Sequence, residues 1–101
     1  MENRLMVQEG HLLAVFNSAH RVMKAESVLK GLGLPILLIP APRLLQTDCG
    51  LALRFTEDDR VAVMEALQRE RLLPAFISVY QNGAFVTTWV NEDDTQGENG
   101  E

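Results

Sequence analysis

The chain has 101 residues, a net charge of −5 and a hydrophobic share of 47%, which fits one domain that can bury a core without disulfides or metals. It contains one cysteine, so an internal disulfide is excluded and we expect a reducing compartment, the cytoplasm. No run reaches the ~20 apolar residues that a membrane span needs. The first ten residues lack the apolar stretch of an export signal, and no basic stripe is present that would attract nucleic acid.

The negative charge is concentrated at the end of the chain. Five of the 14 acidic residues lie in residues 91–101, which contain no basic residue, and the other nine match the nine Lys and Arg. A segment that is acidic and lacks apolar residues is typical of a disordered tail. We therefore predict an N-terminal extension over 1–10, a single domain over 11–90 and a disordered acidic tail over 91–101.

The first predicted elements are a strand and a helix. Residues 11–18 form a short apolar run with β-branched and aromatic side chains, which predicts a strand. Ser18 is suited to cap a helix, because its hydroxyl can accept a hydrogen bond from a free amide of the first turn. Apolar residues recur at helical spacing from Ala19 to Leu32, and Gly33 provides the stop.

The middle of the chain predicts two strands joined by a loop. Residues 35–39 are nearly all apolar and predict a buried strand, which Pro40 and Pro42 end because proline cannot donate to a ladder. The loop runs from 41 to about 48. Residues 50–55 alternate large apolar side chains with Ala52 and Arg54, the pattern of a half-buried strand.

The remainder predicts a second helix and a hairpin. Thr56 precedes three acidic residues, which suit the positive end of a helix dipole. Pro74 closes this helix, whose inner face we expect to carry Val61, Met64, Leu67 and Leu72. Two β-type runs, 76–80 and 84–90, then flank Asn82-Gly83, a dipeptide that favours a hairpin because both residues accept a positive φ.

This order of elements predicts an α+β fold, a ferredoxin-like βαββαβ two-layer sandwich with an added C-terminal hairpin strand. In that topology the loop between the second and third strands lies at the same end of the sheet as the start of the first helix. Cys49 closes that loop, and Arg43 lies within it. We therefore expect both residues to lie near Ser18, His20 and Arg21.

Cys49 is the candidate catalytic group. Free helix amides, the positive helix end and the guanidinium groups of Arg21 and Arg43 favour a thiolate, the nucleophilic form of cysteine. Gly50 would give a substrate access to the sulfur and let the backbone bend sharply. Asp48 acts in the opposite direction, because an adjacent carboxylate favours the neutral thiol. The sequence leaves this balance open, and a small buried hydrophobic residue is the alternative interpretation of Cys49.

Two neighbouring residues, His20 and Arg43, also have both a functional and a non-functional interpretation. His20 is a candidate base or thiolate partner, and an idle surface histidine is its alternative. Arg43 is a candidate anion-binding residue, with a solvated loop residue as its alternative. There is no second cysteine for a CxxC pair and no set of zinc ligands, so neither a metal nor a cofactor is predicted.

Three short motifs follow one another at close spacing: Ser18-Ala-His20-Arg21, then Pro40-Ala-Pro42-Arg43, then Cys49-Gly50. In this combination the chain resembles the selenium/sulfur carrier protein-like family, from about residue 11 to the second helix. The resemblance implies that Cys49 holds sulfur or selenium as a persulfide or selenopersulfide and passes it between donor and acceptor proteins. Pro40, Pro42, Arg43 and Gly50 would form the surrounding motif. Members often have serines before the cysteine, whereas this chain has Thr47 and Asp48.

We therefore expect a thiol carrier or accessory protein rather than a stand-alone enzyme, because no acid–base partner accompanies the cysteine. The alternative is a non-catalytic ligand-binding or dimerising regulatory module. In that case the sheet face away from the helices would form a homodimer contact through Tyr80, Phe85 and Trp89. The other interpretation is that these three side chains contribute only to the ordinary packing of a small sheet.

Overall fold

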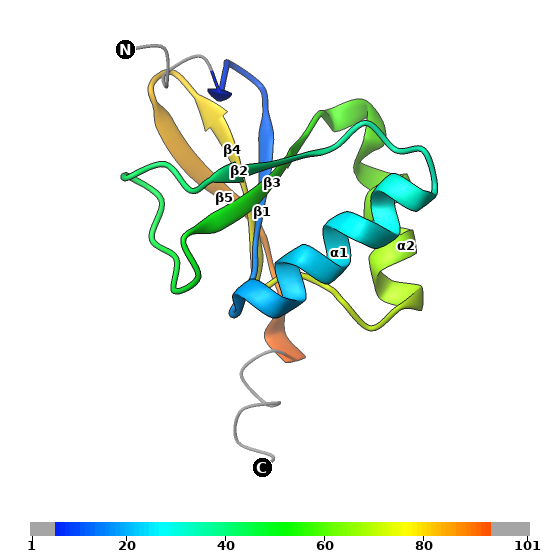
Figure 1. Ribbon diagram of the computed structural model, residues 1–101. Helices are drawn as coiled ribbons and strands as arrows, with labels where there is room; N and C mark the ends of the chain where they lie inside the picture. Colours follow the sequence, from blue (N-terminus) through cyan, green and yellow to red (C-terminus); the bar gives the residue numbers. More distant parts are fainter. Residues whose placement is uncertain (1–5, 94–101) are drawn as a thin grey trace.

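The computed structural model describes residues 6–93 and contains a five-stranded sheet with helices packed against it (Figure 1). The strands are β1 (Leu12–Val15), β2 (Leu37–Pro40), β3 (Leu51–Phe55), β4 (Phe76–Gln81) and β5 (Ala84–Val90). The helices are α1 (Ala19–Gly31) and α2 (Arg60–Arg69), and a 3₁₀ turn at Glu57–Asp59 leads into α2. The mixed α+β fold is therefore confirmed. None of the helices within the described residues is long and apolar enough to cross a lipid bilayer.

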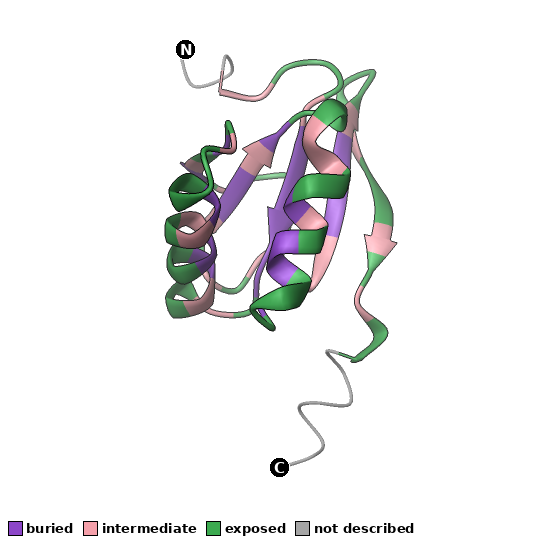
Figure 2. Cartoon of the chain, turned by 90° about the vertical axis from the view of Figure 1, so that its right-hand side faces the viewer, coloured by how far each residue is buried: buried purple, intermediate pink, exposed green. Residues whose placement is uncertain are grey.

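The strands of the sheet follow the order β2-β3-β1-β4-β5, and every neighbouring pair is antiparallel. β1 is central, since Leu12 lies opposite Phe55 of β3 and opposite Val79 of β4. Figure 2 shows α1 and α2 on the same face of the sheet. Two layers result, with one face of the sheet covered by helices and the other turned away from them.

Both ends of α1 form as the sequence predicts. Ser18 has extended backbone angles, and its Oγ accepts a hydrogen bond from the backbone N–H of Arg21 at 3.2 Å. At the other end the N–H of Gly33 donates to the carbonyl of Lys30, and the N–H of Leu34 donates to the carbonyl of Leu29. This pair of bonds is the Schellman ending, which satisfies the last carbonyls of the helix.

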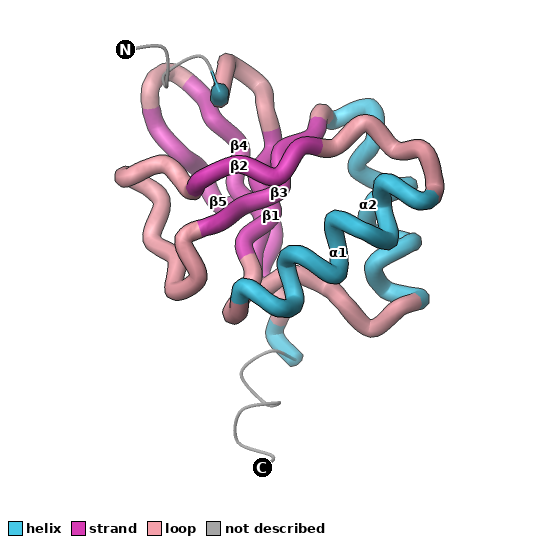
Figure 3. Tube along the Cα trace, in the orientation of Figure 1, coloured by secondary structure: helices cyan, strands magenta, loops and turns pink. Residues whose placement is uncertain are grey.

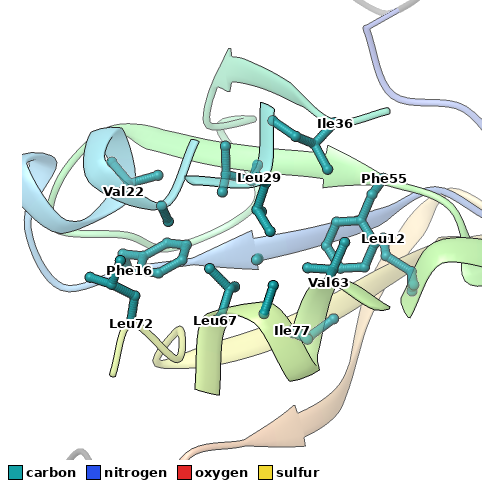
Figure 4. Close-up of a cluster of buried hydrophobic side chains, with 14 of the residues drawn as sticks. Leu12, Phe16, Val22, Leu29, Ile36, Phe55, Val63, Leu67, Leu72 and Ile77 are labelled. Atoms are coloured by element: carbon teal, nitrogen blue, oxygen red, sulfur yellow. The ribbon is translucent and has the colours of Figure 1, made fainter. Parts of the chain in front are cut away.

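The main core lies between the helices and the sheet (Figure 4). Phe16 and Phe55 are its largest buried side chains, and Val22 and Leu29 of α1 pack with them. Burying a side chain of this size contributes roughly 1.5–3 kcal/mol to stability. The cluster also includes residues from α2, from the segment after it and from β4, namely Val63, Ala66, Leu67, Leu72 and Ile77.

The inner face predicted for α2 is wrong at Val61, whose side chain is exposed, while Met64 is half-buried. The buried residues of this helix are Val63, Ala66 and Leu67. Apolar residues occupy both possible stripes, so helical spacing alone does not distinguish them. Packing against α1 and the sheet selects the stripe that contains Val63.

The predicted strand over 35–39 is shifted, because β2 spans Leu37–Pro40 and includes the proline expected to end it. Pro40 lies opposite Leu51 of β3. β2 is an edge strand, where proline is tolerated because one side of the strand needs no ladder hydrogen bonds.

A second cluster covers the face of the sheet away from the helices. Its buried members are Leu13, Val15, Ile39, Leu45 and Ala52, and Met6 and Val7 pack against it. Arg54 holds this N-terminal segment by donating from Nη1 to the Met6 carbonyl at 2.6 Å. Residues 6–10 of the predicted extension therefore pack on the domain. Residues 1–5, and residues 94–101 of the predicted acidic tail, lie outside the described residues.

The hairpin forms at Asn82-Gly83, where both residues have positive φ, 53° and 82°. Beyond it, the register between β4 and β5 shifts at Ile77/Ser78, because Thr88 is an extra residue in β5. An extra residue reverses the facing of the side chains that follow it. Trp89 consequently packs on the helix-side core, whereas Phe85 packs on the opposite face beside Tyr80. The predicted grouping of these three aromatic residues on one face is therefore wrong.

Candidate functional site

Figure 3 shows the loop between β2 and β3. Cys49 lies near the end of this loop, two residues before β3 begins. The N–H of Ala41 donates to the carbonyl of Gly50 at 2.9 Å and closes the base of the loop, and the N–H of Leu45 donates to the Pro42 carbonyl at 3.0 Å. Leu45 is buried in the cluster on the face away from the helices. The loop is thus anchored on the sheet before the chain reaches the cysteine.

The Cys49 thiol lies at the rim of the main core. Its Sγ is 3.4 Å from the backbone oxygen of Phe16 and 3.4 Å from that of Leu51. Phe16 directly follows β1 and stands two residues before Ser18, the cap of α1. The residue as a whole is half-buried, and its sulfur contacts the backbone that leads into α1.

The side chain of Thr47 contacts the sulfur, although the sequence reasoning did not select it as a site residue. Its Oγ1 accepts a hydrogen bond from the Cys49 N–H at 3.2 Å and lies 3.5 Å from Sγ. A hydroxyl can accept from a thiol and can also donate to a thiolate, whereas the carbonyls of Phe16 and Leu51 can only accept. The signal in the sequence is the threonine two residues before the cysteine, a spacing typical of hydroxyl-to-backbone turns.

Gly50 has a φ of 75°, and a Cβ added to it would meet no atom within 4 Å. A side chain would therefore fit in space, but the left-handed backbone disfavours every residue other than glycine. The sharp bend predicted after Cys49 is confirmed.

Ser18 and His20 lie at the start of α1, two and four residues after Phe16. The Ser18 hydroxyl is engaged as the helix cap, so the N–H groups of Ala19 and His20 are the first-turn amides that helix geometry leaves without an intrahelical acceptor. The side chains of His20 and Arg43 are exposed. Over residues 6–93 the structure shows neither of these two side chains in a hydrogen bond or an ion pair.

Arg21 has a different environment from the predicted one. Its Nη2 lies 3.3 Å from the backbone oxygens of Arg71 and of Leu73. Arg71 has a φ of 59° and directly follows the C-cap of α2. The guanidinium therefore joins the start of α1 to the end of α2, and among the described residues it has no hydrogen bond to Cys49.

Pro40 and Pro42 shape the first part of the loop, Pro40 as the last residue of β2 and Pro42 through the carbonyl that Leu45 binds. Within the described residues, His, Cys, Asp and Glu side chains form no group of three or more that could hold a metal ion. The groups that contact the sulfur are the hydroxyl of Thr47 and the backbone carbonyl oxygens of Phe16 and Leu51, and of these only the hydroxyl can donate a hydrogen bond. A hydroxyl that donates in this way can stabilise an anion on sulfur.

Comparison with known proteins adds one finding. Residues 11–78 match the model of the family described as Putative Se/S carrier protein-like. The match extends past the second helix into β4, further than the resemblance seen from the motifs. No curated protein and no solved structure matches the chain. Because the matched segment covers more than half of the 101 residues, the chain belongs to the Putative Se/S carrier protein-like family.

Proposed function

We propose that this protein carries a sulfur or selenium atom on Cys49 and passes it between partner proteins. The observation that carries the proposal is the position of the chain's one cysteine. It is half-buried, and its Sγ lies 3.4 Å from the Phe16 carbonyl beside the first turn of α1. A carrier needs a sulfur that solvent and a partner can reach, and it needs no internal acid–base pair.

The proposed transfer is a thiol exchange without net oxidation. The Cys49 thiolate attacks the outer sulfur of a donor protein's persulfide, and the donor's S–S bond breaks as the donor cysteine leaves as a thiolate. The new bond joins Cys49 Sγ to the transferred atom, which carries the negative charge. Release repeats the exchange, as an acceptor thiolate attacks the outer atom and Cys49 leaves as the thiolate. Selenium follows the same steps as the outer atom of a selenopersulfide.

Ionisation changes what the sulfur needs from its neighbours. The neutral thiol can donate to the carbonyl oxygen of Phe16 or of Leu51, but a thiolate has no proton to donate and is repelled by both oxygens. The Thr47 hydroxyl can rotate and donate to the anion instead. We therefore assign Thr47 as the group that serves both states of the cysteine.

The outer atom of the loaded form extends beyond Sγ and carries the charge. We propose that the first-turn amides of Ala19 and His20 and the exposed cations of Arg43 and His20 stabilise it. Asp48 is also exposed, so solvent screens its effect on the anion.

Five further residues support this arrangement without reacting. Ser18 caps α1 and thereby fixes the first turn, and Arg21 holds that turn against the end of α2. Pro40 and Pro42 restrict the loop, and Gly50 provides its bend. In this proposal Ser18 and Arg21 are positioning residues rather than direct contacts of the anion.

The proposal extends to partners, compartment and fold. The partners are sulfur or selenium donor and acceptor proteins, and the compartment is the cytoplasm, where thiols stay reduced. We also assign the fold as a ferredoxin-like sandwich. The supporting observation is that β1 lies between β3 and β4 with β2 outside β3, while β5 is added beyond β4.

The test is a complete loading and release cycle. The protein is mixed with a small-molecule persulfide, freed of excess reagent and analysed by intact mass spectrometry, before and after addition of an acceptor thiol. We expect one added sulfur atom, lost on release, and no addition to Cys49→Ser. Addition that is equal in wild type and Cys49→Ser, or addition that an acceptor thiol cannot remove, contradicts the proposal.

A further inference from the structure

The two edges of the sheet differ in length and chemistry. β2 is four residues long and ends in Pro40, and Pro42 follows two residues later. Short edge strands and prolines are devices that prevent an edge from pairing with another chain. β5, at the other edge, is seven residues long with the sequence AFVTTWV. It contains neither a proline nor a charged residue, so the bulge at Thr88 is the one such device within this strand.

The edge at β5 offers unpaired backbone groups, with an exposed apolar side chain on each face of the sheet. In an edge strand, alternate backbone N–H and C=O groups point away from the sheet and act as a template for another strand. Val86 and Val90 are large apolar residues of β5 that are exposed. The bulge at Thr88 disturbs the strand near its end, but Ala84–Gln81 and Val86–Val79 keep a regular register before it.

A groove lies beside this edge on the helix side of the sheet. Its volume is about 380 Å³, and its apolar lining includes Val61 and Met64 of α2 together with Ile77 and Trp89 of the sheet. Charged residues Glu57, Arg60 and Glu65 also line it. A strand added next to β5 would continue the floor of this groove and cover part of Trp89.

We propose that β5 pairs with β5 of a second copy of this chain, in antiparallel orientation, to form one continuous sheet across a two-fold axis. A second copy fits because β5 has no charge, so pairing with itself brings no like charges together within the strand. The antiparallel orientation is selected by the acids that follow β5, Glu92 and Asp93. It keeps the two acidic ends at opposite ends of the interface, whereas a parallel pair would bring them side by side.

The geometry of this dimer follows from the symmetry. Residues that lie opposite one another in an antiparallel pair share a face of the sheet, so the two-fold axis runs perpendicular to the sheet. The helices of both copies then lie on the same side. The Cys49 loop connects β2 and β3, which β1 and β4 separate from β5, so the interface leaves both thiols free. The inference is therefore independent of the proposed carrier function.

The test measures the mass of the full chain in solution by sedimentation or light scattering, over about a hundredfold range of concentration. We expect a species of twice the chain mass of 11.3 kDa that dissociates on dilution. Val86→Lys places a charge in the middle of β5 and should leave a monomer. Leu37→Lys is the matched control, since Leu37 is an apolar residue of the opposite edge with an exposed fraction of 38%, compared with 46% for Val86. It should leave the dimer unchanged.

Circular dichroism checks that each variant folds, and Val90→Lys replaces Val86→Lys if the latter does not. Amide hydrogen exchange of the wild type gives an independent readout, because β5 amides should exchange more slowly at high concentration than at low. A wild-type protein that is monomeric at every concentration overturns the proposal. This outcome includes the case in which β5 pairs only with a strand of an unrelated protein. A dimer that survives both lysine variants in β5, or one that Leu37→Lys disrupts, overturns it as well.

Discussion

The carbonyl oxygen of Phe16 lies 3.4 Å from the sulfur of Cys49, although 33 residues separate them in the chain. The contact joins the end of β1 to the end of the β2–β3 loop. It holds the thiol beside the backbone that leads into α1, and in the proposed function the first-turn amides and the positive helix end stabilise the anion. In that proposal the reactivity of the cysteine depends on how firmly the loop is held in this position.

Thr47 should control both the position and the reactivity of Cys49. Thr47→Val keeps the shape of the side chain but removes the oxygen that accepts from the Cys49 N–H and contacts its sulfur. We expect a loss of about 1 kcal/mol of stability and a changed rate of alkylation by iodoacetamide in the folded state. Gln46→Ala changes an exposed neighbour in the same loop and should affect neither measurement. Equal alkylation rates in Thr47→Val and wild type would contradict the assigned role.

Two adjacent leucines test how the loop is anchored. Leu45 has an exposed fraction of 6% and packs on the sheet, whereas Leu44 has an exposed fraction of 76%. Leu45→Ala should cost about 2–4 kcal/mol in urea unfolding and accelerate alkylation of Cys49, because the loop loses its anchor. Leu44→Ala should change stability by less than about 0.5 kcal/mol. Similar effects of the two substitutions would show that the loop is held in another way.

Alanine substitutions at Gly50 and Gly31 distinguish the effect of backbone strain from the effect of steric crowding. A Cβ at either position would meet no atom within 4 Å, but only Gly50 of this pair has a positive φ. Gly50→Ala should therefore destabilise by about 1–2 kcal/mol. Gly31→Ala, at the end of α1, should stabilise by up to about 1 kcal/mol. The measurement is chemical denaturation of both variants, and a shift of the same sign in both would refute this reasoning.

His11 should make stability depend on pH. Burial, and secondarily the charge of Arg54, lower the pKa of His11 below its ordinary value of 6.5, and its Nδ1 accepts a hydrogen bond from the N–H of Gln8. The unfolded chain then binds a proton more readily than the folded one. The stabilising effect is present above pH 6.5 and is lost as the pH falls from 6.5 through the lowered pKa.

The check is urea unfolding at several pH values on either side of 6.5. Wild type should lose stability on the acid side, and His11→Gln should lose less over the same interval. His20→Gln removes the other histidine of the chain and should retain the dependence that His11 causes. An identical loss in wild type and His11→Gln would assign the pH dependence to other groups.

Local signals in the sequence predicted most elements of the fold. The cap at Ser18, the stop at Gly33 and the turn at Asn82-Gly83 act through neighbouring residues, so sequence spacing reveals them. The bulge at Thr88 carries no such signal, because it depends on how β5 pairs with β4. The facing of Trp89 was therefore not predictable from alternation.

In the candidate site, too, some features were predictable from the sequence and others were not. Strand order and helix position were sufficient to bring Cys49 to the start of α1, since chain connectivity sets which loops share an end of the sheet. The direction of the Arg21 side chain was not predictable, because its acceptors on Arg71 and Leu73 lie 50 and 52 residues away. Thr47 was detectable in principle from its spacing to the cysteine.

The most direct measurement is the intact mass of the protein purified quickly from cells without reducing agents. We expect a fraction of wild type to carry one additional sulfur or selenium atom, which a reductant removes and which Cys49→Ser lacks. A wild-type protein that never carries the extra atom, even when cells are supplied with sulfide or selenite, would contradict the account.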